Sequence, residues 1–232
     1  LFLHRFCWLP TWPIMLLLLL LQFLALLAGS TNSGCSYEAV AELRSKVVQE
    51  NYDPALMTGL WYEHIYIDPA QIGASCQTLN VTFDAGTNTL NTDFSVLYGS
   101  QPFTIVEHYA PEDSSKKGVY KKYVDIPFGI PGGSLVTLPT AVVIAELSPD
   151  GSRYDSMVLS SCYSLLVTTI EELVVFSRKP SMDEQRLRAL LKAVREQGGN
   201  FREADLQHVD HSKCPSMAAA HDVQGAAGIL FQ

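Results

Sequence analysis

The stretch Gly59-Leu60-Trp61-Tyr62-Glu63 opens an alternating run that we interpret as a first β-strand. Far downstream, Val174-Val175-Phe176-Ser177-Arg178-Lys179-Pro180 closes another such run. A tryptophan at the start of the first strand and an arginine at the end of the last can meet only if the sheet curls back on itself. The guanidinium of Arg178 would then stack on the indole of Trp61 and seal one end of a barrel. This pair favours a hollow binding protein over an enzyme with a loop-borne active site.

The segment between these motifs contains short strand-like runs separated by turn residues. Eight consecutive strands with short connections favour an all-β fold, an eight-stranded up-and-down antiparallel β-barrel that has no exposed edge and has room for one small ligand. A Greek-key sandwich is the competing all-β fold. A loop rich in glycine and proline, 127–133, interrupts the series. The expected strands are 59–67, 76–83, 90–98, 103–109, 119–126, 141–147, 154–161 and 168–178.

Two helices flank the predicted strands. Residues 36–50 form a short lead-in helix, with Val40, Leu43 and Val47 expected on one face. After the last strand, Ser181 and Glu184 have the spacing of a capping box, and Gly198-Gly199 ends the helix that follows. This second helix carries a single apolar stripe, so we expect it to pack on the outside of the barrel. The stripe consists of Leu187, Leu190, Leu191 and Val194.

The N-terminus has the layout of a secretory signal peptide, which we place at 1–30. His4 and Arg5 precede a stretch from Ile14 to Ala28 that is apolar except for Gln22, and small residues follow. A transmembrane helix is the alternative, but a bilayer needs about 20 apolar residues. The barrel domain is expected at 31–215, followed by an Ala/Gly-rich, disordered tail at 216–232.

The formal net charge of −8 disfavours binding to nucleic acid or to anionic membrane surfaces. Removal of the leader would take away Arg5 and make the chain slightly more acidic. Two lysine pairs, Lys116-Lys117 and Lys121-Lys122, bracket a turn, and we interpret them as a solvated hairpin end. We expect no stable membrane insertion.

Four cysteines remain after Cys7 of the leader is set aside, and an even number in a secreted chain implies disulfides. Three pairings are possible, and spacing alone does not choose among them. Cys35 lacks the leucine that a bacterial lipoprotein signal would place before it. Asn80-Val81-Thr82 is an N-glycosylation sequon, which agrees with secretion from a eukaryotic cell. The remaining cysteines are Cys35, Cys76, Cys162 and Cys214.

With both motifs in place, the chain resembles the lipocalins, and within them the apolipoprotein D-like branch, over about 50–215. The first family motif corresponds to Tyr52-Asp53 through Gly59-Leu60-Trp61-Tyr62-Glu63, and the third to the run ending at Arg178-Lys179-Pro180. The middle motif, usually a threonine-aspartate-tyrosine turn, is degenerate here at Glu146 through Gly151. The resemblance implies the disulfides Cys35–Cys162 and Cys76–Cys214.

The resemblance also implies a carrier of a small hydrophobic ligand, such as a fatty acid, sterol, retinoid, carotenoid or bilin. Gly59, Trp61 and Arg178 are expected to be structural. Tyrosines suit a cup that holds a mostly apolar ligand with a polar end, and Glu63 would be a buried acid in need of a hydrogen-bond donor. We expect neither cofactor nor metal ion. The expected ligand-binding residues are Glu63, Ile65, Phe94, Val96, Tyr98, Phe103, Ile105, Tyr109, Tyr120 and Tyr123.

Other functions compete with that of a carrier. A lipocalin-fold enzyme, similar to xanthophyll de-epoxidases or prostaglandin isomerases, would need an acid or thiol at the ligand: Glu63, His64, Asp93 or Cys76. An oxidised Cys76 has no thiolate to attack with. His208, His211 and Cys214 have spacing that a zinc ion could use, but a tail with an oxidised cysteine is favoured. A receptor or carrier protein could contact the open-end loops, particularly 127–133.

Overall fold

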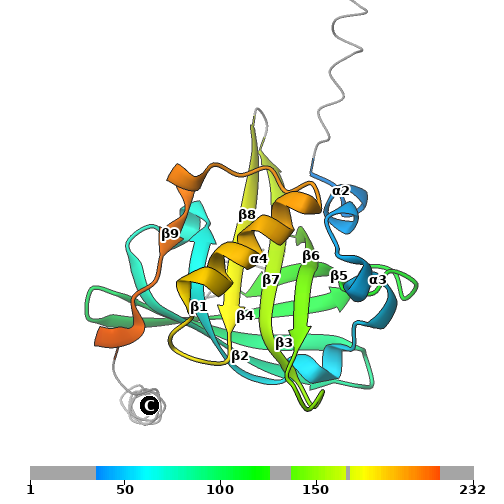
Figure 1. The fold of residues 1–232 in the computed structure, drawn as a ribbon, viewed down its shortest axis with the longest axis horizontal. Helices are drawn as coiled ribbons and strands as arrows, with labels where there is room; N and C mark the ends of the chain where they lie inside the picture. Colours follow the sequence, from blue (N-terminus) through cyan, green and yellow to red (C-terminus); the bar gives the residue numbers. More distant parts are fainter. Residues whose placement is uncertain (1–34, 126–136, 166–167, 215–232) are drawn as a thin grey trace, which may run out of the picture. The chain divides into compact units, whose positions relative to one another are not determined.

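The computed structural model describes residues 35–125, 137–165 and 168–214. Each of eight antiparallel strands pairs with the next, and β1 pairs with both β8 and β2, so that the barrel closes (Figure 1). The predicted up-and-down barrel is confirmed. The strands are β1 (Gly59–Ile67), β2 (Ala74–Asp84), β3 (Thr89–Tyr98), β4 (Gln101–Pro111), β5 (Val119–Asp125), β6 (Thr137–Leu147), β7 (Tyr154–Leu165) and β8 (Thr168–Ser177).

Several sequence predictions fall outside the described residues. These are the signal segment at 1–30, the Gly/Pro loop at 127–133 and the tail at 216–232. Among the helices of the described residues, none is both long and apolar enough to span a bilayer.

Strand β1 contains a bulge that changes which side chains face the interior. Glu63 pairs with Phe176 of β8 and Ile65 pairs with the adjacent Val175, so His64 is the extra residue. Trp61 and Glu63 point into the barrel, whereas Ile65 packs in the apolar cluster beneath α4. The expectation that Ile65 binds ligand inside the barrel is therefore wrong, because the inserted residue interrupts the simple alternation of β1.

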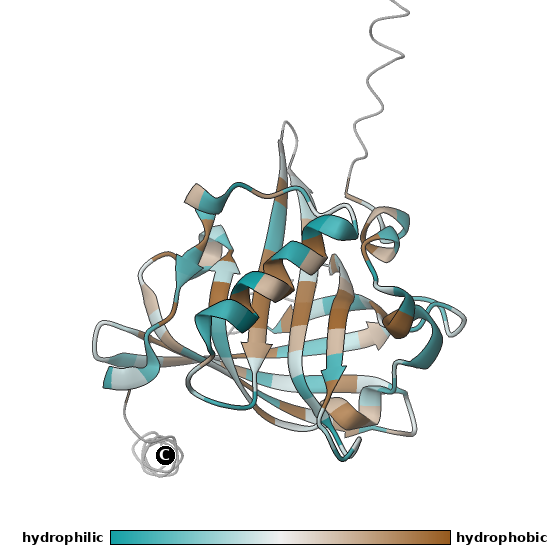
Figure 2. Ribbon diagram, viewed as in Figure 1, coloured by the Kyte–Doolittle hydropathy of each residue, from teal (hydrophilic) through white to brown (hydrophobic). Residues whose placement is uncertain are grey.

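Apolar side chains form two main clusters, one on each side of the sheet. The inner cluster fills the closed end of the barrel around Trp61, Met57 and Phe176. The outer cluster lies between the sheet and helix α4 (Glu184–Glu196), which crosses the strands in Figure 1. Figure 2 shows apolar residues on the strands that run beneath this helix. The predicted stripe of Leu187, Leu190, Leu191 and Val194 is buried there, as expected.

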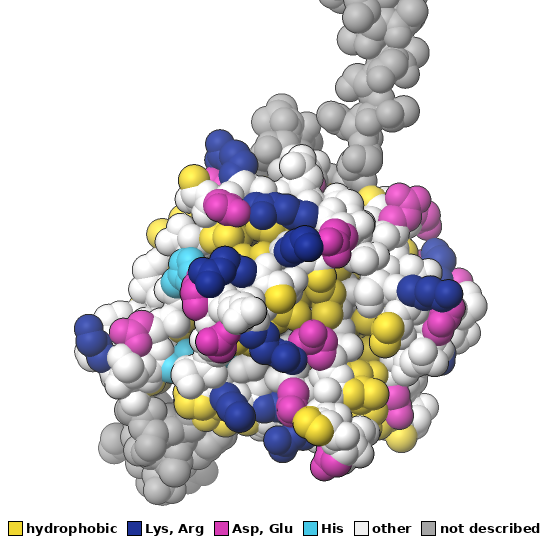
Figure 3. Space-filling model, in the orientation of Figure 1, with side chains coloured by type: hydrophobic (Ala, Val, Ile, Leu, Met, Phe, Trp, Pro, Cys, Tyr) yellow, Lys and Arg dark blue, Asp and Glu magenta, His cyan; other side chains and the backbone are white. Residues whose placement is uncertain are grey.

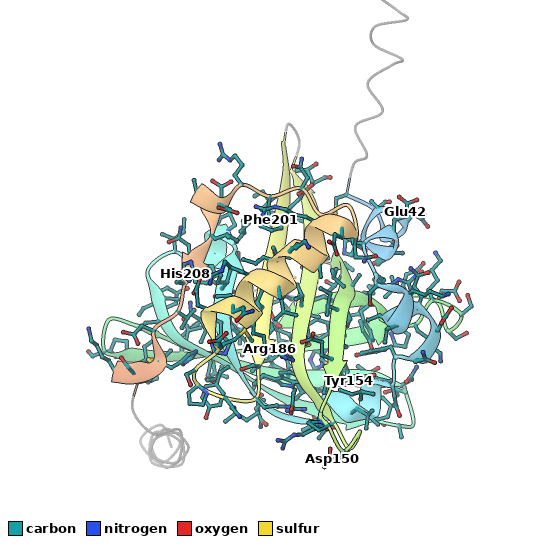
Figure 4. All side chains as sticks on the ribbon, in the orientation of Figure 1. Glu42, Asp150, Tyr154, Arg186, Phe201 and His208 are labelled. Carbon is teal, nitrogen blue, oxygen red and sulfur yellow. A yellow bond between two sulfur atoms is a disulfide. The ribbon has the colours of Figure 1, made fainter. Side chains whose placement is uncertain are left out.

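The start of α4 differs from the capping-box prediction. Asp183 is the N-cap, and its carboxylate accepts hydrogen bonds from the amides of Gln185 and Arg186. Ser181 lies two residues before this cap. Arg186, labelled in Figure 4, reaches the sheet, where its Nη2 lies 2.6 Å from Oε2 of Glu146. Polar contacts thus fix the helix at its first turn, and apolar contacts hold it along its length.

The lead-in region forms two short helices, α2 (Tyr37–Glu42) and α3 (Lys46–Asn51), instead of one. Ser45 caps the second by accepting from the amide of Val48. The break changes the helical phase, so Val48 is buried and Val47 is 57% exposed. The predicted face of Val40, Leu43 and Val47 is wrong at its last member. The 3-10 turns η1 (Pro54–Met57) and η2 (Pro69–Gln71) flank β1.

The C-terminal segment returns to the barrel after α4. It contains η4 (Glu203–Asp205), the two-residue strand β9 (Gln207–His208) and η5 (His211–Lys213). Strand β9 pairs with Ile65 and Tyr66 of β1, beyond the part of β1 that pairs with β2. On the face that carries α4, acidic and basic side chains are interspersed, and Figure 3 shows no large patch of one charge there.

Both disulfides implied by the resemblance are present. Cys35 is bonded to Cys162 and Cys76 to Cys214, with Cα–Cα distances of 5.4 and 5.6 Å. The bridges join the N-terminal segment to β7 and the C-terminal segment to β2. They close loops of more than a hundred residues, the kind of loop for which chain-entropy arguments give the larger stabilisation.

Candidate ligand-binding site

The closed end of the barrel is sealed by Arg178. Its guanidinium carbon lies 3.8 Å from the centre of the Trp61 ring, so the predicted stacking is confirmed. Burial lowers the pKa of Arg178 to about 10, and the nearby charge of Arg153 adds to this effect. Its nitrogens donate to five backbone carbonyls: those of Leu56, Met57, Thr58, Leu60 and Tyr154.

Gly59 makes this close approach possible. Its φ of +104° is a conformation that L side chains rarely adopt, and a Cβ there would lie 3.2 Å from Nη1 of Arg178. The Trp61 indole donates to the carbonyl of Met57 at 2.8 Å. The indole of Trp61 and the guanidinium of Arg178 thus spend their hydrogen bonds on backbone carbonyls of the protein, which agrees with the structural role expected for Gly59, Trp61 and Arg178.

A group of tyrosines lies just above this floor. The hydroxyl of Tyr120 donates to that of Tyr52 at 3.0 Å, and the Tyr52 ring stacks on Tyr154 at 5.7 Å. The void beside Tyr120 has a volume of only about 10 Å³. Tyr120, expected to contact ligand, therefore lies in a filled region where its hydroxyl already has a partner.

A larger cavity of about 130 Å³ lies inside the barrel and is lined by residues from all eight strands. Ligand pockets for drug-sized molecules run to about 300–1,000 Å³, whereas an engineered cavity of about 150 Å³ binds benzene. The space thus suits one ring or a short chain. The apolar part of its wall comprises Leu79, Phe94, Val96, Ile105, Leu138, Leu159, Val174 and Phe176.

Charged residues other than the expected Glu63 also border this cavity. Lys122 lies in the interior, with Nζ 3.0 Å from Oε1 of Glu107 and 3.6 Å from Oε2 of Glu172. Its side chain is 13% exposed, so its interpretation as part of a solvated hairpin end is wrong. Tyr109 donates to Oε2 of Glu107 at 2.6 Å. Glu107 on β4, Lys122 on β5 and Glu172 on β8 thus form an ion-paired triad.

Burial and charge act in opposite directions on Lys122. Burial alone lowers the pKa of a lysine, but the two carboxylates and Tyr109 raise the pKa of Lys122 well above its ordinary value. Burial raises the pKa of Glu172, an effect that Lys122 opposes. Lys122 is therefore protonated at neutral pH, and its charge is committed to Glu107 and Glu172.

Glu63 is the exception among the buried acids. It has 0% exposure, and neither carboxylate oxygen has a hydrogen-bond partner in the described structure. Burial raises the pKa of Glu63 well above its ordinary value, and the charge of Asp68 adds to this. The side chain of Gln71 opposes this shift in the pKa of Glu63, and its own Oε1 accepts from Gln77 at 3.2 Å. Glu63 is thus a fully buried acid that borders the cavity.

The predicted ligand-binding residues fall into three groups: those that border the cavity, those packed in the inner apolar cluster away from it, and those on the outer side of the sheet. Phe103 packs against the inner cluster, with its ring 6.3 Å from that of Tyr98. Tyr123 lies on the outer side of β5, where Lys121 Nζ sits 5.1 Å from its ring centre, so the expectation of an inward Tyr123 is wrong. Ile65 is outside for the reason given above. Those that border the cavity are Glu63, Phe94, Val96, Tyr98, Ile105 and Tyr109.

Strand parity was the signal that could have found Lys122. Tyr120, Lys122 and Val124 alternate along β5 with Lys121 and Tyr123, so the two sets face opposite sides of the sheet. Placing both Tyr120 and Tyr123 inside was inconsistent with this period. An inward Tyr120 requires an inward Lys122.

Of the groups that an enzyme would need, the structure brings only one to the cavity. Cys76 is bonded to Cys214, and Asp93 is exposed on β3 between inward residues. His64 faces the outer groove of about 370 Å³ between the start of α4 and the C-terminal segment. Only Glu63 borders the interior space. Among the described residues, no set of three or more His, Cys, Asp or Glu side chains is placed to hold a metal ion.

No family model and no curated protein sequence matches this chain. Several solved structures do match its fold. Apocrustacyanin C1 aligns with a TM-score of 0.56 at 15% identity, covering 83% of this chain and 93% of its own. The chain has the lipocalin fold. Lobster apocrustacyanin A1 aligns at 0.54 with 16% identity over 79% of this chain and 92% of its own.

Insecticyanin from the tobacco hornworm Manduca sexta aligns at 0.54 with 10% identity, over 70% of this chain and 82% of its own. An odorant-binding protein aligns at 0.50 with 13% identity, over 71% of this chain and 98% of its own. At these identities the likeness establishes the lipocalin fold alone.

Proposed function

We propose that this protein is a secreted lipocalin of the apolipoprotein D-like branch that binds and carries a small hydrophobic ligand. The observation that carries the proposal is the apolar-walled cavity of about 130 Å³ inside a barrel whose floor is closed. Such a site binds by removing apolar surface from water and needs no covalent step. The ligand contacts are Glu63, Phe94, Val96, Tyr98, Ile105 and Tyr109.

Three features support secretion: the disulfides, the leader segment and the glycosylation sequon. Two disulfides persist only in an oxidising compartment, and the leader at 1–30 has the layout of a signal peptide. Asn80 lies between the inward residues Leu79 and Val81, so its side chain points outward, where a glycan has room. The apolipoprotein D-like branch is supported by the pairing of the four cysteines.

A carrier role is favoured over catalysis because no cysteine is among the described residues that line the cavity, and Cys76 is held in a disulfide. Among the solved structures with this fold, one is named for binding odorants, which are small and apolar. The volume of the cavity favours ligands of that size over sterols, carotenoids or bilins.

The test is displacement of an apolar fluorescent probe from the purified oxidised protein by small ligands and by members of each larger lipid class. A matched pair of variants locates the site. Ile105→Trp fills the cavity, whereas Val106→Trp places the same bulk on the outer face, where Val106 is 36% exposed. We expect the first to abolish binding and the second to preserve it. Absence of saturable displacement by every class would overturn the proposal.

A further inference from the structure

The cavity contains one carboxyl group more than the described residues pair. Glu107 and Glu172 share the ammonium of Lys122, at 3.0 and 3.6 Å, and Glu107 also accepts from Tyr109. Glu63 has no comparable partner for either oxygen. A fully buried polar group without a partner costs free energy, so Glu63 calls for a donor that the described part of the chain does not supply.

The charges that line the cavity are unbalanced in one direction. Glu63, Asp68, Glu107 and Glu172 border it, and Lys122 is the lining residue that carries a positive charge. That charge is already held between two carboxylates. Because electrostatic interactions strengthen away from bulk water, an entering cation gains from this surplus and an entering anion is repelled.

The remaining wall is apolar and limits the size of the guest. Phe94, Val96 and Ile105 from β3 and β4 face Val174 and Phe176 of β8 across the space. The volume of about 130 Å³ approaches that of a cavity known to hold a single benzene ring. A suitable guest therefore combines one ring, or a short chain, with one donor group.

We propose that the barrel binds a small hydrophobic monoamine, with its ammonium group held by the Glu63 carboxylate and its ring against the apolar wall. This inference rests on the proposed carrier function and specifies its ligand class. Binding is non-covalent. The ion pair forms whether the amine enters as a cation beside an ionised Glu63 or enters neutral and takes the proton from the carboxylic acid.

Three probes with the same ring test the head group: 2-phenylethylamine, 2-phenylethanol and 3-phenylpropionate, each titrated calorimetrically at neutral pH. A hydrogen bond to a charged partner predicts roughly 10- to 100-fold tighter binding of the amine than of the alcohol. The carboxylate should bind most weakly. Equal binding of amine and alcohol would overturn the amine assignment while leaving the carrier function intact.

Glu63→Gln removes the anion with little change of shape, and we expect it to lose the preference for the amine and to keep the affinity for the alcohol. The matched control is Glu171→Gln, which makes the same substitution on β8 one residue from Glu172 but on the exposed outer side. It should leave all three affinities unchanged. Unaltered amine binding by Glu63→Gln, or an equal loss in Glu171→Gln, would overturn the inference.

Failure of the two proposals is distinguishable. If none of the three probes binds but a larger apolar probe is displaced by another lipid, the carrier function stands and the monoamine inference fails. If no apolar compound binds at all, both fail. Selectivity among the three probes in the unsubstituted protein decides the question even if Glu63→Gln does not fold.

Discussion

The ammonium nitrogen of Lys122 lies 3.0 Å from Oε1 of Glu107 in the interior of the barrel. The two residues come from adjacent strands, and the third member, Glu172, comes from the strand that closes the barrel. A lysine with low exposure is tolerated only with such partners, and each carboxylate depends on it in return.

Replacement of Lys122 by Met should therefore be strongly destabilising, because it leaves two buried carboxylates without their cation. Breaking a buried ion pair on one side costs about 3–5 kcal/mol. Lys121→Met, on the outer side of the same strand, should change the free energy of unfolding by about 0.5 kcal/mol or less. Urea denaturation of both variants measures the difference. Similar losses in the two would contradict the interior placement of Lys122.

Glu63→Gln should stabilise the protein at neutral pH. Because the pKa of Glu63 is raised in the folded state, the unfolded chain releases this proton at a lower pH than the native protein does. The stability linked to this group is complete below pH 4 and is lost as pH rises. We expect a gain of about 1–3 kcal/mol at pH 7 that disappears near pH 4. A pH-independent difference between variant and parent would contradict this assignment.

Arg178→Lys should weaken the closed end despite keeping its positive charge. A lysine cannot reproduce the planar set of donors that reaches five carbonyls, nor the stack on Trp61. The loss of several of these partly buried hydrogen bonds and of the stack costs about 2–4 kcal/mol in the free energy of unfolding. The control, Arg188→Lys on α4, alters an exposed pair with Glu184 and should be near neutral in the same thermal or urea experiment.

His64 should make the protein less stable in acid. Burial, assisted by the charge of His211, lowers the pKa of His64 to about 4, whereas the unfolded residue titrates near 6.5. Between these values the unfolded chain binds a proton that the native protein does not, so stability falls as pH drops from about 6.5 to 4.

His64→Asn should flatten this part of the stability profile, which urea titrations at pH 7 and 4.5 would detect. His208→Asn changes an exposed histidine, labelled in Figure 4, and serves as the control. Identical profiles for the parent and His64→Asn would show that another group governs the acid response.

The fold was predictable because its strongest signals are local or come in a matched pair. The alternation after Gly59 and the motif at Arg178 implied a closed sheet, and period-two runs separated by turns gave the number of strands. The apolar stripe of α4 was equally predictable, because its residues recur at helical spacing. The N-cap was misplaced by two residues because Ser181 and Asp183 offer competing side-chain acceptors, and only the tertiary path of the chain selects one.

The site was less predictable because its decisive contacts join distant strands. Nothing near Lys122 in sequence reveals that β8 will place Glu172 beside it, so a charged side chain was assigned to solvent. The bulge at His64 similarly has no strong sequence signal, and it moved Ile65 to the outer side of the sheet. Apolar residues on β3 and β4 were placed well, since uninterrupted alternation fixes their side.

Strand β9, in the C-terminal segment, covers part of an edge of β1. Beyond Tyr62, β1 no longer pairs with β2, and the edge at Ile65 and Tyr66 is covered by Gln207 and His208. Reduction of Cys76–Cys214, or cleavage before Gln207, would free this cover and expose unsatisfied main-chain groups beside apolar side chains. Such an edge is a template for strand addition by a second molecule. The short segment after α4 therefore covers a strand edge that would otherwise be open, a role separate from ligand binding in the cavity.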